Sequence, residues 1–236
     1  MDNPLFVGPP LEEGPLPAVF YFALSDEESL HLDPFNQPVQ FLKDARVRIF
    51  SLTIPGHGKG LDPTKAIAHW RDQMDQGIDP LTPFFTKAAQ VIERLAAENV
   101  VSKVAVAGLS RGAFVAMQIA ARTELIDTIL GFAPLTNISY AQEFQGFHPT
   151  YLSLDPLIIK LCNRTIRFYM GNRDERTGTG HCFALVQKLV EAANERRIRS
   201  APIEMIIGPS IGHKGHGTSP EVFKDGANWL KGQLDV

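Results

Sequence analysis

Short apolar runs recur along the chain and alternate with segments whose apolar residues fall on one helical face. Such runs are typical of strands that a parallel sheet buries on both sides. Polar residues separate them, and the polar stretch at 25–33 is predicted to be a loop. The runs predict six strands, at residues 17–24, 47–53, 104–107, 127–133, 165–170 and 202–207.

Helix signals fill the gaps between these strands. Asp62-Pro63, Thr82-Pro83 and Ser219-Pro220 each pair a capping residue with a proline suited to the first helical position. Apolar stripes and stop signals then predict helices at residues 38–44, 63–76, 83–99, 113–121, 183–193 and 220–234. Strands joined by helices predict right-handed crossovers and a three-layer α/β/α sandwich around a mostly parallel sheet of about six to eight strands.

The chain length fits one domain of this class, 236 residues in all. Residues 1–16 contain four prolines and two glycines and are predicted to be an extended lead-in. Residues 134–161 are irregular and rich in aromatic side chains, which favours a short cap segment there.

The composition and charge argue against a nucleic-acid-binding protein and against a membrane-spanning one. The formal net charge of −3 gives no basic signature of nucleic-acid binding. No apolar run is long enough to span a bilayer, and no signal peptide is visible. The two cysteines, Cys162 and Cys182, show no metal-ligand spacing and favour free thiols in a reducing compartment. We therefore expect a cytoplasmic protein, whose oligomeric state the sequence does not indicate.

The strongest chemical signal is Gly108-Leu109-Ser110-Arg111-Gly112, which lies between a buried strand and a helix. In that context the sharp turn pushes the serine hydroxyl out at the end of the strand, and the helix N-terminus favours negative charge beside it. Ser110 is therefore a candidate nucleophile. A tight crossover with an incidental serine is the alternative.

A serine nucleophile needs a base and an acid that orients the base. Asp174 follows the fifth predicted strand and is the candidate acid, although aspartate after Gly-Asn is also common in plain turns. Its neighbour Glu175 is interpreted as a surface residue. The loop after the fourth strand has no acidic residue up to Tyr140, which favours Asp174.

Two histidines follow the last strand, three positions apart, and either could be the base. His213 is favoured because it comes sooner after the strand. His216 is the alternate base. The chain order serine, aspartate, histidine is the order expected when these groups meet above such a sheet.

The motifs GLSRG, GNRDERTG and PSIGHKGHG together resemble the α/β-hydrolase superfamily over roughly residues 17–236, in its small serine esterase and dienelactone-hydrolase-like or prolyl-oligopeptidase-like branches. The resemblance implies a small-molecule ester substrate, with no metal and no organic cofactor. It also implies an oxyanion hole made by the backbone N–H of Arg111 and that of Leu24 or Ser25. Dienelactone hydrolases use cysteine as nucleophile, so their own activity is not implied.

The sequence indicates less about which residues would contact the substrate than about the nucleophile, acid and base. Phe144, Phe147 and Tyr151 are candidates for an acyl pocket, or else pack the cap segment onto the domain. The Arg111 side chain could meet an acidic substrate group, or else form a salt bridge or face solvent at the start of the helix. His57, in Pro-Gly-His-Gly, is interpreted as a structural loop residue.

Three functions fit this pattern. The first is a serine hydrolase of a small to medium carboxylic ester or thioester, acting through an acyl-enzyme. The second is a peptidase or amide hydrolase of the same fold. The third is a non-catalytic, hydrolase-like binding domain, which would not need all three candidate residues.

Overall fold

A seven-stranded sheet organises the computed structural model, which describes residues 4–236. The strand order is β1-β3-β2-β4-β5-β6-β7, and β1 alone runs antiparallel to its neighbour. The α/β sandwich with a mostly parallel sheet is therefore confirmed. The strands are β1 (Leu5–Val7), β2 (Leu16–Phe22), β3 (Arg48–Ser51), β4 (Val101–Leu109), β5 (Ile126–Phe132), β6 (Thr165–Gly171) and β7 (Ile203–Gly208).

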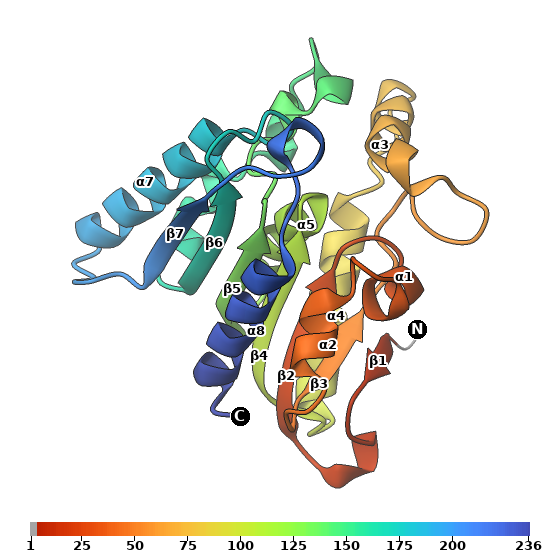
Figure 1. Cartoon of the computed structure of the whole chain (residues 1–236), viewed down its shortest axis with the longest axis vertical. Coiled ribbons are helices and arrows are strands. Elements are labelled where there is room, and N and C mark those ends of the chain that lie inside the picture. The colour runs from red at the N-terminus through yellow and green to blue at the C-terminus, as the bar shows by residue number, and fades with distance from the viewer. Residues whose placement is uncertain (1–3) are drawn as a thin grey trace.

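Helices cover both faces of the sheet (Figure 1). On one face lie α1 (Asp26–His31), α2 (Gln37–Leu42) and α8 (Pro220–Leu234), and on the other α4 (Thr82–Ala97), α5 (Arg111–Ala120) and α7 (Thr179–Glu195). Alternation along β2 divides the core accordingly, with Phe20 and Phe22 in the α4–α5 layer and Val19 and Tyr21 in the α2–α8 layer. Within residues 4–236, no helix combines the length and the apolar character needed to cross a membrane.

Two local predictions differ from the structure. The stretch predicted as a loop at 25–33 contains α1, which Ser25 caps by accepting the Glu28 N–H while the Glu28 carboxylate accepts the Ser25 N–H. This reciprocal capping box makes a short polar helix stable without an apolar stripe. The region predicted as an extended lead-in contains β1, which extends the sheet beside β3, and residues 1–3 of that region lie outside the described residues.

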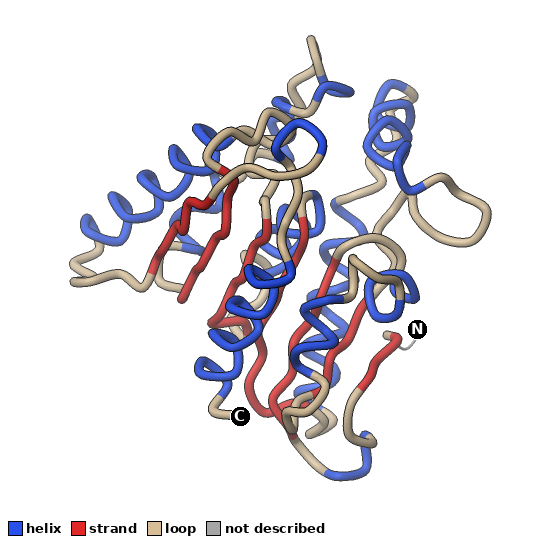
Figure 2. Tube along the Cα trace, viewed as in Figure 1, coloured by secondary structure: helices blue, strands red, loops and turns tan. Residues whose placement is uncertain are grey.

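The segment between β5 and β6 stands over the carboxyl ends of the strands. It consists of short 3₁₀ turns followed by α6 (Ile158–Leu161), and one turn contacts α3 (Ala66–Asp75). The Arg71 guanidinium of α3 lies 4.1 Å from the ring centroid of Phe147 in this segment. Figure 2 shows the loops that follow β4, β6 and β7 gathered at this same end of the sheet.

Gly112 marks the tightest approach between layers. A Cβ placed there would lie 1.9 Å from the backbone oxygen of Phe22, so α5 is in direct backbone contact with β2. Gly108 is equally constrained, because its Cβ would lie 2.2 Å from the carbonyl carbon of Gly112. No side chain fits at either place, and the crossover from β4 to α5 depends on both glycines.

We predict that Gly112→Ala lowers the free energy of unfolding by about 3 kcal/mol or more, because the methyl group forces α5 away from the sheet. The matched control is Gly232→Ala in α8, where an added Cβ meets no atom within 4 Å. That change should raise stability by about 0.5 kcal/mol through helix propensity. Denaturant unfolding of both variants checks this, and equal effects would contradict the argument.

Candidate active site

Ser110 occupies a strained turn between β4 and α5. Its backbone angles are φ 57° and ψ −117°, a left-handed conformation that side chains disfavour. The turn is fixed from both sides, since the Ser110 N–H donates to the Phe132 oxygen at 2.8 Å and the Ser110 oxygen accepts from the Leu135 N–H at 3.1 Å. This geometry presents Oγ at the carboxyl end of the sheet.

The side chains of Ser110, His216 and Asp174 form one hydrogen-bonded chain. His216 Nε2 lies 2.8 Å from Ser110 Oγ, and His216 Nδ1 lies 2.7 Å from Asp174 Oδ2. The Asp174 side chain is fully buried, whereas that of His216 remains 15% exposed. A serine hydroxyl is thus paired with an imidazole whose other nitrogen is held by a buried carboxylate.

The loop after β6 fixes Asp174. Its Oδ1 accepts the N–H groups of Arg176 at 2.9 Å and Thr177 at 3.0 Å. Burial opposes ionisation of this carboxyl, but the His216 hydrogen bond and the two backbone N–H groups outweigh burial and hold the pKa of Asp174 below its usual value. Asp174 is therefore an anion at neutral pH.

The geometry corrects the preference for His213. After β7 the chain folds back so that Ile211 and Gly217 pair across a loop, and the residue next to this bridge, His216, faces Ser110. His213 opens the intervening 3₁₀ turn and is exposed at the rim of the cavity. Sequence distance from β7 does not identify the histidine that faces Ser110, because the Ile211–Gly217 bridge closes the loop and the later histidine, His216, lies beside that bridge.

The backbone N–H groups predicted to form the oxyanion hole differ in whether they already donate a hydrogen bond within the chain. Arg111 is the first residue of α5, where a backbone N–H has no partner within the helix. The Leu24 N–H donates to Ser29 Oγ at 3.0 Å, and the Ser25 N–H donates to the Glu28 carboxylate at 3.2 Å. Both candidates for the second donor therefore already have acceptors within the chain.

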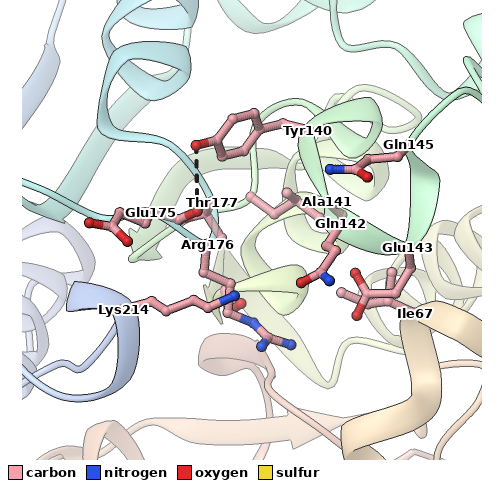
Figure 3. A pocket seen from close by; sticks show the side chains of 12 residues that line it. Ile67, Tyr140, Ala141, Gln142, Glu143, Gln145, Glu175, Arg176, Thr177 and Lys214 are labelled. Carbon is pink, nitrogen blue, oxygen red and sulfur yellow. Dashed lines mark hydrogen bonds between the residues drawn. The ribbon is translucent and has the colours of Figure 1, made fainter.

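Ser110 borders two cavities. One, of about 420 Å³, extends toward β2 and includes Leu24, Arg111 and His216 in its lining. The other, of about 240 Å³, lies toward the segment between β5 and β6 and is lined by Tyr140, Glu143 and Arg176 among others (Figure 3). In the described part of the chain, no three His, Cys, Asp or Glu side chains are grouped so that they could hold a metal ion.

The three aromatic residues predicted for the acyl pocket line neither of these cavities. Phe144 is fully buried in the core, and Phe147 packs against it at 6.0 Å between ring centroids. Tyr151 is 53% exposed and lies elsewhere on the segment. One turn of the segment between β5 and β6 contacts α3, and Phe144 and Phe147 pack in or against the core and not around Ser110.

Two residues near the nucleophile turn, His57 and Arg111, have buried side-chain nitrogens without hydrogen-bond partners. His57 is buried, neither ring nitrogen has a hydrogen-bond partner, and Arg111 Nη1 is likewise buried without one. Burial, together with the positive charge of Arg111, lowers the pKa of His57 to about 3. From the sequence, His57 is interpreted as structural; Arg176 lies within the GNRDERTG motif but is not singled out there, and Glu143 lies in no motif.

His57 should make stability depend on pH. The unfolded chain protonates this histidine below about 6.5, whereas the folded protein does not until about 3, so stability should fall with decreasing pH between these values. The slope for one group is up to about 1.4 kcal/mol per pH unit. Denaturant unfolding between pH 7 and 5 should show this slope in wild type and reduced in His57→Gln.

The control for this measurement is His69→Gln, because His69 is exposed on α3. It should retain the wild-type slope. An unchanged slope in His57→Gln would mean that His57 is protonated in the folded state at the same pH as in the unfolded chain.

Similarity to known proteins is found in the fold and not in the sequence. No family model and no curated protein matches the sequence. The fold is similar to that of TT1662 from Thermus thermophilus, with a TM-score of 0.69, 16% identity, and coverage of 95% of this chain and 91% of that one. It is also similar to a cold-adapted esterase from an Arctic intertidal metagenomic library, with a TM-score of 0.68, 16% identity, and coverage of 97% and 87%.

A third similar structure is ATU1826 from Agrobacterium tumefaciens, a protein of unknown function grouped with the α/β-hydrolases. Its TM-score is 0.64 at 15% identity, with coverage of 98% of this chain and 91% of that one. These likenesses concern the fold, and the superfamily branch that the motifs resemble stays a prediction. The loop motifs, the sheet and these likenesses agree on the α/β-hydrolase fold for this chain.

Proposed function

We propose that this protein is a serine hydrolase that cleaves a small to medium carboxylic ester or thioester through an acyl-enzyme. One observation carries the proposal: the His216 imidazole joins Ser110 Oγ to the buried Asp174 carboxylate at 2.8 and 2.7 Å. Nucleophile, base and orienting acid have this mutual geometry in hydrolases of unrelated folds. The likeness to an esterase supports the same reading.

In the first half-reaction, Ser110 Oγ attacks the carbonyl carbon while His216 Nε2 accepts its proton. Negative charge develops on the carbonyl oxygen, and the Arg111 N–H at the start of α5 is placed to stabilise it. The C–O bond to the leaving group then breaks, and His216 returns the proton to the departing alcohol. Asp174 fixes the imidazole tautomer and stabilises its charged form.

Water completes the cycle. It attacks the acyl-enzyme carbonyl while His216 accepts a proton from it, and Ser110 regains that proton as the acid product leaves. Every proton therefore has a donor and an acceptor in Ser110, His216, water or the leaving group. The two cavities beside Ser110 would take the acyl and alcohol parts of a compact substrate.

The second oxyanion donor in this proposal is the Leu24 N–H, since Leu24 lines the larger cavity beside Ser110 and Arg111. Its present acceptor is Ser29 Oγ, which also accepts the Ala23 N–H at 3.1 Å. A hydroxyl oxygen that holds two N–H groups can lose one of them to a negatively charged oxygen, because charge-assisted hydrogen bonds are stronger. Ser25 is less suitable, since its N–H is held by the Glu28 carboxylate.

Hydrolysis of a p-nitrophenyl ester series from acetyl to dodecanoyl tests the proposal. Ser110→Ala and His216→Ala should each lower kcat by about 10³-fold or more, because nucleophile and base act as one unit. His213→Ala, on the same loop but outside the hydrogen-bonded chain, is the matched control and should stay within about threefold of wild type.

Labelling by a fluorophosphonate probe is the companion measurement, since it reports an activated serine without requiring the right ester. Wild type should label and Ser110→Ala should not. A wild type that neither labels nor hydrolyses any ester faster than Ser110→Ala would favour a binding domain. Labelling together with cleavage of amides alone would favour the peptidase alternative.

A further inference from the structure

Arg111 carries an unpaired charge beside the nucleophile. Its Nη1 atom is buried without a hydrogen-bond partner, and within residues 4–236 its guanidinium makes no salt bridge. Arg111 is one of the residues that line the 420 Å³ cavity, as is Ser110. Burial is the largest influence on Arg111 and lowers its pKa to about 10, so it remains a cation at neutral pH.

Arg176 brings a second guanidinium to the same place. It lines both cavities at Ser110, and across the described residues its side chain has no hydrogen bond or ion pair. Figure 3 shows it reaching into the smaller cavity from the loop that carries Asp174, opposite Glu143. Its charge also lowers the pKa of Arg111, which places the two cations within electrostatic reach of each other.

Two carboxylates face this pair without neutralising it. Glu143 and Glu28 both raise the pKa of Arg111, yet neither forms an ion pair within 4.0 Å with it or with Arg176. The Glu28 carboxylate is held by the Ser25 N–H and hydroxyl. Two like charges at a partly desolvated site disfavour the folded state unless an anion joins them.

We propose that Arg111 and Arg176 form an anion site beside Ser110 and that the preferred substrate is an ester carrying a carboxylate. This inference rests on the proposed hydrolase function. Guanidinium groups match the two oxygens of a carboxylate, and a pair of them can bind one from two directions. The charged side chains that line the larger cavity, Arg111, Arg176 and Glu143, sum to +1 (2 − 1 = +1), which suits a monoanion.

The rest of the lining indicates an organic acid rather than an inorganic ion. Leu24, Phe35 and Ile67 border the larger cavity together with the two arginines. Such a surface suits a short hydrocarbon chain with the ester at one end, near Ser110, and the acid group at the other. His57 is not among the residues that line this cavity, and it would stay neutral and not compete for the carboxylate, since its pKa lies far below 7.

Two pairs of esters, matched in length, test the inference. Monoethyl glutarate is compared with ethyl pentanoate for a carboxylate on the acyl side, and 3-carboxypropyl acetate with butyl acetate for the alcohol side. In each pair a carboxylate replaces a methyl group. We expect wild type to prefer the charged member of at least one pair by about tenfold or more in kcat/KM, the size of one charged hydrogen bond.

Variants of the two arginines test whether their charges cause the preference for the charged ester. Arg176→Gln and Arg111→Met should each reduce the ratio of charged to neutral ester about tenfold. Glu143→Gln should increase that ratio, because it removes a competing carboxylate. Arg173→Gln is the matched control, since Arg173 is on the same loop but its side chain is 82% exposed and pairs with Glu175. Its ratio should equal that of wild type.

A binding measurement tests the anion site independently of the hydrolase activity. Calorimetry of the Ser110→Ala variant with glutarate and with 4-hydroxybutanoate, the carboxylate products, needs no turnover. Binding that Arg176→Gln abolishes supports the anion site even if neither ester is cleaved. Hydrolysis of neutral esters that depends on Ser110, with no charge preference and no product binding, would overturn the anion site and leave the hydrolase proposal standing. A charge preference unchanged in both arginine variants would also overturn it.

Discussion

The site depends on backbone contact between α5, β4 and β2. Ser110 adopts a conformation that costs on the order of 1–3 kcal/mol, and such strain persists only where the surroundings determine it fully. Gly112 lies against the Phe22 oxygen, and Gly108 lies against Gly112. Because no side chain separates these backbones, α5 begins directly at the sheet, with Arg111 as its first residue next to Ser110.

A second set of contacts joins the loops that carry Asp174 and His216. Ser210 Oγ accepts the Arg173 N–H at 2.7 Å, and the Glu175 N–H donates to the Lys214 oxygen at 3.0 Å. A Cβ on Gly215 would lie 2.2 Å from the Arg173 oxygen. The acid and the imidazole are therefore positioned by one connected structure, in which a shift of either loop displaces both.

Two residues, His57 and Arg111, have buried side-chain nitrogens without hydrogen-bond partners, and Arg111 follows the strained turn and lines the larger cavity. Arg111 and Arg176 are cations of like sign that share one space. The buried Arg48, by contrast, donates to the backbone oxygens of Pro9, Gly14 and Val100. This contrast is expected where residues are arranged for a ligand rather than for stability alone.

The sequence by itself determined the six parallel strands, the main helices and the turn at Ser110, because hydrophobic period and glycine spacing are local properties. It also contained the signal for α1, the Ser25 and Glu28 pair, which the polar composition of that stretch obscured. The choice of Asp174 needed only chain order and the position of a strand end.

Only the tertiary structure decided between His213 and His216, since the path of a loop with three glycines is set by contacts with the Asp174 loop and not by spacing. It alone decided that Phe144 is core and that Arg111 and Arg176 share a cavity with Ser110. Those facts depend on residues far apart in the chain, and a single sequence carries no record of such distances.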